Sequence, residues 1–231
     1  MKKYISLSVW GDKPRYIIGA QRQIQLASEF FPEWKVLVYT DNAEPFKGYT
    51  NAETIVRPAD MNGVFWRFEP LFEDDNNIVI VRDSDGRITF REALAVNHWL
   101  NSDKKFHIFR DHEAHTEFPI IACAFGLKGK LSDHARSVMD RFVEQPFYYT
   151  NDQVYLRDFV YPEIKDDAMI HSHTSGWFGV TRKCLLNSYS FCGNGYDEND
   201  MPLYPPTLAE CKSFDPSKLD KRYKFDKGVL V

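Results

Sequence analysis

The chain opens with short, mainly apolar runs, separated by a longer segment in which apolar residues recur every three or four positions. The runs Tyr4–Trp10, Lys35–Thr40 and Asn77–Val81 are typical of strands, and Glu53–Arg57 indicates a further short strand. After the first run, Pro14 suits an early helical position, and the apolar residues that follow it have helical spacing. The first half therefore predicts strands that alternate with helices.

The second half predicts further elements. We expect helices at Met61–Phe72, after the capping box Thr89–Glu92, at Leu131–Glu144, and from Thr150, which opens a second capping-box pattern, to Val160, with Pro162 ending this last one. We expect extended segments at Phe106–Phe109, Pro119–Phe125 and Ala168–Ile170. This alternation predicts an α/β fold with a mostly parallel central sheet flanked by helices. Ligands of such sheets bind at the carboxyl ends of the strands.

Composition and charge narrow the class of protein. The 231 residues are 43% hydrophobic and 15% aromatic, enough for one large core, and the net charge of −4 argues against nucleic acid as the main partner. The four cysteines form no C-x-x-C pair, so reduced thiols are expected. The sequence shows neither a signal peptide nor an apolar run of about 20 residues. We expect a cytoplasmic protein, with peripheral membrane contact left open.

The most informative polar segment is Arg82–Arg87, which follows the strand at Asn77–Val81. Asp83 and Asp85 lie one residue apart there, between two arginines. Carboxylates hold divalent cations such as Mn²⁺ or Mg²⁺, which also bind diphosphates and stabilise a departing one. The same Asp-Ser-Asp-Gly sequence is also good turn chemistry, so the motif alone leaves both readings open.

Other residues suggest roles around such a centre. His171 or His173 could complete a metal site, because imidazole binds transition metals, although an exposed loop histidine is the commoner case. Asp152 is the candidate general base for the acceptor hydroxyl, although acidic residues favour the first turn of any helix. Arg67 could meet a phosphate.

The block from Arg82 to His115 resembles a recurring block of GT-A-type glycosyltransferases of bacterial and large-virus origin. It carries R-D-S-D-G-R, then R-E, A-V, W-L, S-D, H-I-F-R-D-H and a last histidine, and the later D-Q-V-Y-L before Y-P also matches. The N-terminal glycosyltransferase domain of a chlorella-virus protein is similar. The resemblance covers most of residues 4–175.

The resemblance implies a single GT-A (Rossmann-like) domain over 1–231, with a nucleotide- and metal-binding half at 1–115 and an acceptor-side half with a C-terminal extension at 116–231. It implies a hexosyl- or deoxyhexosyltransferase that uses a nucleotide-diphosphate donor, expected to be a UDP-sugar, and Mn²⁺ or Mg²⁺. The acceptor would be a hydroxyl of a glycan or glycoconjugate.

Four groups of site residues follow from the residues and the resemblance together. The expected nucleotide-sugar residues are Ser8, Val9, Trp10, Tyr16, Asp41, Arg67, Arg82, Asp83 and Ser84. The expected metal ligands are Asp83, Asp85 and His171. The expected acceptor or sugar residues are Arg110, Asp111, His112, His115 and Gln153, and Asp152 is the expected catalytic residue.

Departures from the family block leave alternatives open. Ala122–Gly126 replaces a glycine pair and a tryptophan, Gly86 replaces a serine, and His171-Ser172 replaces a His-Asp pair. A sugar nucleotidyltransferase and a non-catalytic carbohydrate-binding relative remain the alternative functions. The first would need a glycine-rich, basic N-terminal loop, to which Trp10–Lys13 is a poor match. The second would not require a metal–diphosphate site.

Overall fold

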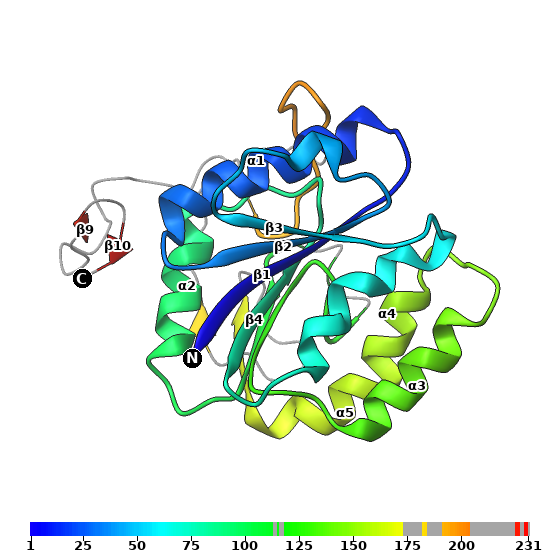
Figure 1. The fold of residues 1–231 in the computed structure, drawn as a ribbon. Helices are drawn as coiled ribbons and strands as arrows, with labels where there is room; N and C mark the ends of the chain where they lie inside the picture. The colour runs from blue at the N-terminus through cyan, green and yellow to red at the C-terminus, as the bar shows by residue number, and fades with distance from the viewer. Residues whose placement is uncertain are drawn as a thin grey trace.

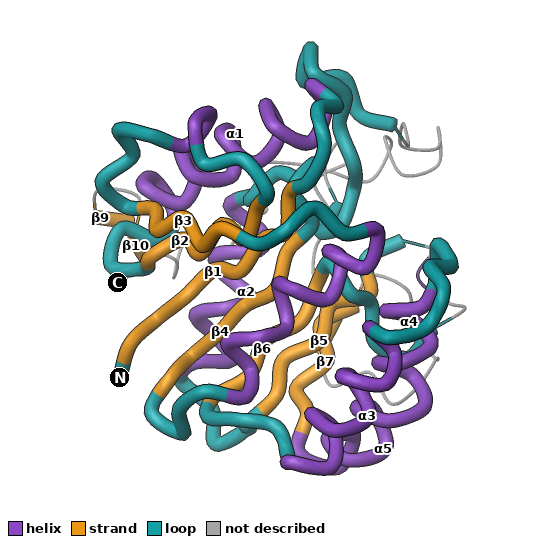
Figure 2. Tube along the Cα trace, turned by 45° about the vertical axis from the view of Figure 1, so that its right-hand side comes forward, coloured by secondary structure: helices purple, strands orange, loops and turns teal. Residues whose placement is uncertain are grey.

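A computed structural model of the chain describes residues 1–112, 115, 118–172, 182–183, 191–203, 225–226 and 229–230. Within these ranges, eight strands form one sheet in the order β3-β2-β1-β4-β6-β5-β7-β8, and Figure 2 labels this series from β3 to β7. The strands of this sheet are β1 (Lys2–Val9), β2 (Lys35–Thr40), β3 (Ala52–Val56), β4 (Asn77–Arg82), β5 (Phe106–Arg110), β6 (Ala124–Lys128), β7 (Ala168–Ser172) and β8 (Arg182–Lys183). Two further short strands, β9 (Phe225–Asp226) and β10 (Val229–Leu230), pair with each other.

The sheet is mostly parallel, as predicted. β6 is antiparallel to both of its neighbours, β4 and β5, and the other neighbouring strands run parallel. All six residues of β4 are buried, which suits a strand covered on both faces.

Helices cover both faces of the sheet (Figure 1). The helical elements are α1 (Pro14–Phe30), η1 (Glu44–Phe46), η2 (Met61–Phe72), α2 (Phe90–Leu100), α3 (Asp133–Val143), α4 (Asn151–Tyr155), η4 (Leu156–Val160), α5 (Tyr161–Ile164) and η5 (Lys165–Asp167). Helices α1 and α2 pack on one face, where they share a core with Ile78 and Ile80 of β4. Elements η2, α3 and η4 pack on the other face, against Val79 and Val81.

The strand order places a topological switch between β1 and β4. From β1 the chain runs outward to β2 and β3 and then returns to β4 on the other side of β1. Because β1 and β4 are parallel neighbours, paired from Lys2 with Asn77 to Ser6 with Val81, their carboxyl ends lie at one edge. Ligands of doubly wound sheets bind at such a point, and the segment that begins at Asp83 follows β4 there.

Some predicted elements differ from the structure in detail. The predicted helix Met61–Phe72 is a 3-10 helix, and in an α-helix the ring of Pro70 would clash with the Trp66 carbonyl. The strand expected at Pro119–Phe125 begins only at Ala124, after a turn in which the Ala124 N–H donates to the Ile121 carbonyl. No helix among the described residues is long and apolar enough to cross a membrane.

The two predicted capping boxes have different outcomes. At the first, the Thr89 hydroxyl accepts a hydrogen bond from the Glu92 N–H at 3.2 Å, which confirms Thr89 as the N-cap, while the Glu92 carboxylate pairs with Arg82. The second is wrong, because Thr150 makes no such side-chain bond. The prediction that Pro162 ends the helix is also wrong. The chain passes through a π-helical turn and continues as α5, where Pro162 lies in the first turn and its missing N–H costs little.

Helix α1 lies unusually close to the segment after β4. A Cβ atom added at Gly19 would lie 2.5 Å from the Ser84 carbonyl oxygen and 2.8 Å from the Asp85 Cα. Both are backbone atoms, so this steric clash could be relieved only if the turn or the helix moved. Gly19 therefore allows α1 to dock directly on the Asp-Ser-Asp-Gly turn.

We expect Gly19→Ala to destabilise the protein by about 1–3 kcal/mol, the usual cost of overpacking. Helix propensity alone would stabilise the variant by about 1 kcal/mol, so the sign of the change reports the close packing. Urea unfolding measures it, with Gln25→Ala on the exposed face of the same helix as the control. A more stable Gly19→Ala variant would contradict the close approach.

Candidate active site

The turn after β4 is held by helix α1. The Gly86 N–H donates to the Asp83 carbonyl at 3.2 Å and closes the turn. The Gln23 amide nitrogen donates to the same carbonyl at 3.0 Å, while the Gln23 oxygen accepts from the Ile88 N–H at 3.0 Å. Gln23 thus fixes both ends of the turn, and the two aspartates of the motif have a defined backbone.

Arg67 joins three of the predicted residues. Its guanidinium forms an ion pair with Asp83 and a second with Asp152, at 2.7 Å from Nη2 to Oδ2. Its backbone N–H donates to the Ser8 hydroxyl at 2.9 Å. The carboxyl ends of β1 and β4, helix η2 and the start of α4 therefore converge on one buried cation.

The charge of Arg67 and those of its two carboxylate partners stabilise each other. Burial disfavours the charged guanidinium, but the carboxylates of Asp83 and Asp152 outweigh it and raise the pKa of Arg67. Burial also raises the pKa of Asp152; Arg67 opposes this rise and the negative charge of Asp83 adds to it. The Asp83 side chain remains 41% exposed, against 6% for Asp152, so Asp83 is the more accessible of the two carboxylates.

Asp85 has its own arginine. Arg15, in the first turn of α1, donates to Asp85 Oδ2 through Nε at 2.7 Å and also through Nη2. Burial raises the pKa of Asp85, and the nearby carboxylate of Asp83 raises it further. Two carboxylates that disfavour each other's charge, and whose oxygens are hard donors, fit a divalent cation.

The expected nucleoside residues lie around the same edge, except Val9. The Trp10 and Trp66 rings meet edge to face with centroids 6.1 Å apart, and Asp41 Oδ2 accepts from the Gly11 N–H at 3.0 Å. The Arg15 guanidinium carbon lies over the Tyr16 ring, 5.1 Å from the centroid of that ring. Val9 is buried in the core beneath α1 and presents no side chain to this edge.

Arg82 and Asp111 belong to the opposite face from Asp83. Arg82 pairs with Glu92 of α2, and Asp111 pairs with Arg91 of the same helix. All four side chains are less than 10% exposed. Successive residues at a strand end point to opposite faces, and Arg82 is directed to Glu92 whereas Asp83 is directed to Arg67. The structure therefore does not support the expected nucleotide contact of Arg82.

His171 is not brought to the two aspartates. Its Nε2 lies 3.1 Å from His98 Nδ1 and its Nδ1 lies 2.8 Å from His107 Nε2, so histidines engage both ring nitrogens. Among the described residues, no group of three or more His, Cys, Asp or Glu side chains could hold a metal. A metal ligand role for His171 finds no support in this geometry, and His173 lies outside the described residues.

The expected acceptor residues are mostly enclosed. Arg110 is buried, and burial lowers its pKa. His115 is also buried, which lowers its pKa to about 4, while His112 stacks on Phe191 at 4.3 Å. The amide of Gln153 contacts the backbone of the segment 120–122. Ser84 is buried beneath α1.

The described segment 191–203 covers the Asp-Ser-Asp-Gly turn. The Tyr196 N–H donates to the Asp85 carbonyl at 2.9 Å, and Arg87 forms an ion pair with Asp200 at 2.8 Å. Gly195 lies against both Arg15 and Asp85, since an added Cβ would be 3.2 Å from Arg15 Nη2 and from Asp85 Oδ2. Sequence reasoning missed this contact and missed Arg15. The position of Arg15 could have indicated its role, because it is a charged residue in the first turn of α1, the helix that follows β1.

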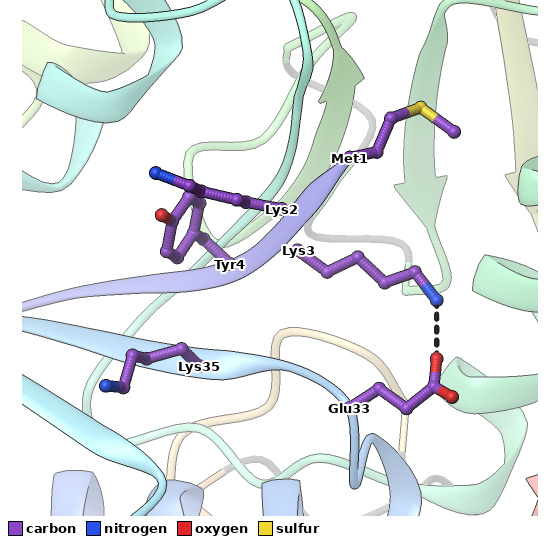
Figure 3. A pocket seen from close by; sticks show the side chains of 6 residues that line it. All are labelled: Met1, Lys2, Lys3, Tyr4, Glu33 and Lys35. Carbon is purple, nitrogen blue, oxygen red and sulfur yellow. Dashed lines mark hydrogen bonds and ion pairs between the residues drawn. The ribbon is translucent and has the colours of Figure 1, made fainter.

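A surface pocket lies at the other end of the sheet (Figure 3). It is lined by Met1, Lys2, Lys3, Tyr4, Glu33 and Lys35, at the amino ends of β1 and β2. Lys3 and Glu33 form an exposed ion pair at 2.8 Å across it. None of the expected site residues lines this pocket, so the charged edge at the carboxyl ends is the better candidate site.

Comparisons with known proteins show distant likenesses. No protein-family model and no curated protein matches the chain. A glycosyltransferase involved in the glycosylation of the major capsid of PBCV-1 is similar in structure, with 13% identity and a TM-score of 0.46 over 75% of this chain and 82% of that one.

Two other solved structures are also similar. The 4-diphosphocytidyl-2C-methyl-D-erythritol synthase of Anaerococcus prevotii shows 9% identity and a TM-score of 0.47, over 74% of this chain and 86% of that one. The bifunctional IspDF of Campylobacter jejuni shows 13% identity and a TM-score of 0.39, over 68% of this chain and 47% of that one. At these identities the likenesses concern the arrangement of the backbone alone.

We expect Glu92→Leu to lower the free energy of unfolding by about 3–5 kcal/mol, because it leaves the buried charge of Arg82 without its carboxylate partner. The double variant Glu92→Leu with Arg82→Met should lose less unfolding free energy than Glu92→Leu alone, since no buried charge remains uncompensated. Urea unfolding checks both. Glu33→Leu, which removes an exposed partner of Lys3, is the matched control and should change stability by about 1 kcal/mol or less. A Glu92→Leu variant as stable as this control would contradict a structural role for the pair.

Proposed function

We propose that the chain is a metal-dependent glycosyltransferase that moves a sugar from a nucleotide-diphosphate donor, expected to be a UDP-sugar, to a hydroxyl of a glycan or glycoconjugate. One observation carries the proposal. Asp83, Arg67 and Asp152 meet at the carboxyl ends of β1 and β4, with the Arg15–Asp85 pair beside them. This collects carboxylates for a cation, guanidinium groups for a diphosphate and a buried carboxylate for proton transfer at one edge.

Asp83 and Asp85 are the residues that would hold Mn²⁺ or Mg²⁺. A divalent cation bound there supplies Lewis-acid stabilisation of the departing diphosphate. Arg15 and Arg67 bind the phosphate oxygens, for which the planar guanidinium fork is well shaped. Trp10, Tyr16 and Asp41, which lie at the ends of β1, α1 and β2, line the side on which the nucleoside would lie.

Asp152 is the proposed base that takes the proton of the acceptor hydroxyl. Its Oδ1 accepts from the Gln153 N–H at 2.8 Å and its Oδ2 faces Arg67, which fixes the carboxylate plane. Each oxygen keeps a further lone pair. Burial raises the pKa of Asp152, which strengthens it as a base. If transfer retains the anomeric configuration, Asp152 instead orients the acceptor or the sugar.

The alternative of a sugar nucleotidyltransferase would use the same edge for a nucleoside triphosphate. The loop from β1 to α1 is short, spanning Trp10–Lys13 with one glycine. It offers few backbone N–H groups to cradle a triphosphate. This observation favours the glycosyltransferase, and product analysis separates the two.

The first test is thermal unfolding against nucleoside diphosphates, nucleoside triphosphates and nucleotide sugars, each with and without Mn²⁺. A ligand of the folded state raises the melting temperature by mass action. We expect stabilisation by one nucleotide sugar with Mn²⁺, release of its nucleoside diphosphate, and loss of both in Asp83→Ala. Asp75→Ala, in an exposed loop, is the control. Pyrophosphate formed from a triphosphate and a sugar phosphate would instead identify a nucleotidyltransferase, and no stabilisation by any nucleotide would sink the proposal.

For Asp152→Asn we expect a fall in kcat of about 10²–10⁴, the usual contribution of a general base. The donor KM should change little, because the amide oxygen still accepts from Arg67. Asp158→Asn is the matched control in the same helical stretch, since Asp158 pairs with Arg157 at the surface. Near-normal transfer by Asp152→Asn would remove Asp152 as the base.

A further inference from the structure

Both aspartates of the Asp-Ser-Asp motif already have a cation from the protein itself. Asp83 pairs with Arg67, and Asp85 pairs with Arg15 at 2.7 Å from Nε. A divalent cation at these carboxylates would therefore meet two guanidinium groups. The inference drawn from this rests on the proposed function, because it concerns how that metal and that diphosphate bind together.

The charges at the site set the condition for metal binding. The ion-paired groups at the site are the carboxylates of Asp83, Asp85 and Asp152 and the guanidiniums of Arg15 and Arg67, whose charges sum to −1. A divalent cation alone would bring the sum to +1 and repel both arginines across a few ångströms. A diphosphate that arrives with the cation restores a negative sum and offers the arginines new partners.

The two arginines differ in how freely they can change partner. The Arg67 side chain is 7% exposed, and its backbone N–H is fixed on Ser8. The Arg15 side chain is 36% exposed and lies beside Gly195, which adds no side chain to the contact. Arg15 can therefore move from Asp85 to a phosphate. Arg67 stays in place, and a phosphate can reach it only at the exposed side, next to Asp83.

We propose that Arg15 and Arg67 act as internal counter-ions that make metal binding at Asp83 and Asp85 depend on the diphosphate of the donor. The cation and the diphosphate bind weakly alone and strongly together. Arg15 is the main determinant of this coupling, because its exposed guanidinium exchanges one anion for another. Arg15 is thus a positioning residue for the metal as well as a diphosphate ligand.

Equilibrium dialysis of Mn²⁺ against the full chain tests this, with UDP, CDP, GDP or ADP at equal concentration on both sides of the membrane. Protein-bound Mn²⁺ is the measurement, so no turnover is needed. Coupling free energies between ligands commonly correspond to 5- to 150-fold changes in affinity. We expect one of these diphosphates to tighten Mn²⁺ binding within about this range, and Mn²⁺ to tighten that diphosphate by the same factor.

Variants assign the coupling to Arg15. In Arg15→Met, we expect Mn²⁺ alone to bind several-fold more tightly than in the unchanged protein, and the effect of the diphosphate to shrink to about threefold or less. Arg15→Lys keeps the charge and should keep most of the coupling. Arg136→Met, which removes a similarly exposed arginine paired with Asp140, is the matched control and should change neither. Circular dichroism confirms that each variant is folded.

The outcomes separate this inference from the proposed function. Equal Mn²⁺ affinity with and without the diphosphate, when both bind, would overturn the internal counter-ions and leave the transferase proposal standing. Coupling between Mn²⁺ and the diphosphate that is unchanged in Arg15→Met would also overturn the counter-ion role and leave the transferase proposal standing. Binding of neither Mn²⁺ nor any of the four diphosphates to the folded protein would overturn both.

Discussion

The burial of one guanidinium, that of Arg67, is the constraint on which the candidate site depends. A buried charge is tolerated only with partners, and here Asp83 and Asp152 provide them while Ser8 fixes the backbone N–H of the same residue. These partners come from the ends of β1 and β4 and from the start of α4. The need to neutralise Arg67 therefore holds together elements that lie far apart in the sequence, and the polar site is a consequence of that need.

The sheet topology explains why the carboxylates lie at this edge. Since β1 and β4 are parallel neighbours at the switch point, the segments that follow them leave from the same edge. Helix α1 begins at that edge and packs back on the turn through Gly19 and Gln23. Its first turn carries Arg15, which thereby faces Asp85. The helix that fixes the backbone of the turn also provides one of its two counter-ions.

The sequence predicted the elements and the edge better than the partners. The apolar run Lys35–Thr40 is a strand with those same bounds because it is continuous and ends at polar residues. Which cation meets which anion depends on tertiary packing. Arg82 illustrates the limit: its neighbour Asp83 lies at the site, yet Arg82 pairs with Glu92 on the other face. Because side chains alternate between the two faces along a strand, the sequence could have predicted that Arg82 and Asp83 point in different directions. For His171 no local signal indicates that two other histidines engage its ring.

Two kinds of ion pair lie near the end of β4. On the α2 face, both members of Arg82–Glu92 and of Arg91–Asp111 are enclosed, so neither pair can exchange its partner without leaving a buried ion alone. At the motif itself, each pair that involves Asp83 or Asp85 has one exposed member, Asp83 at 41% and Arg15 at 36%. A ligand that carries a cation and a diphosphate together can replace both partners at once and leave no charge uncompensated. A site filled with its own ion pairs can thus remain a ligand site, provided that the ligand brings charges of both signs.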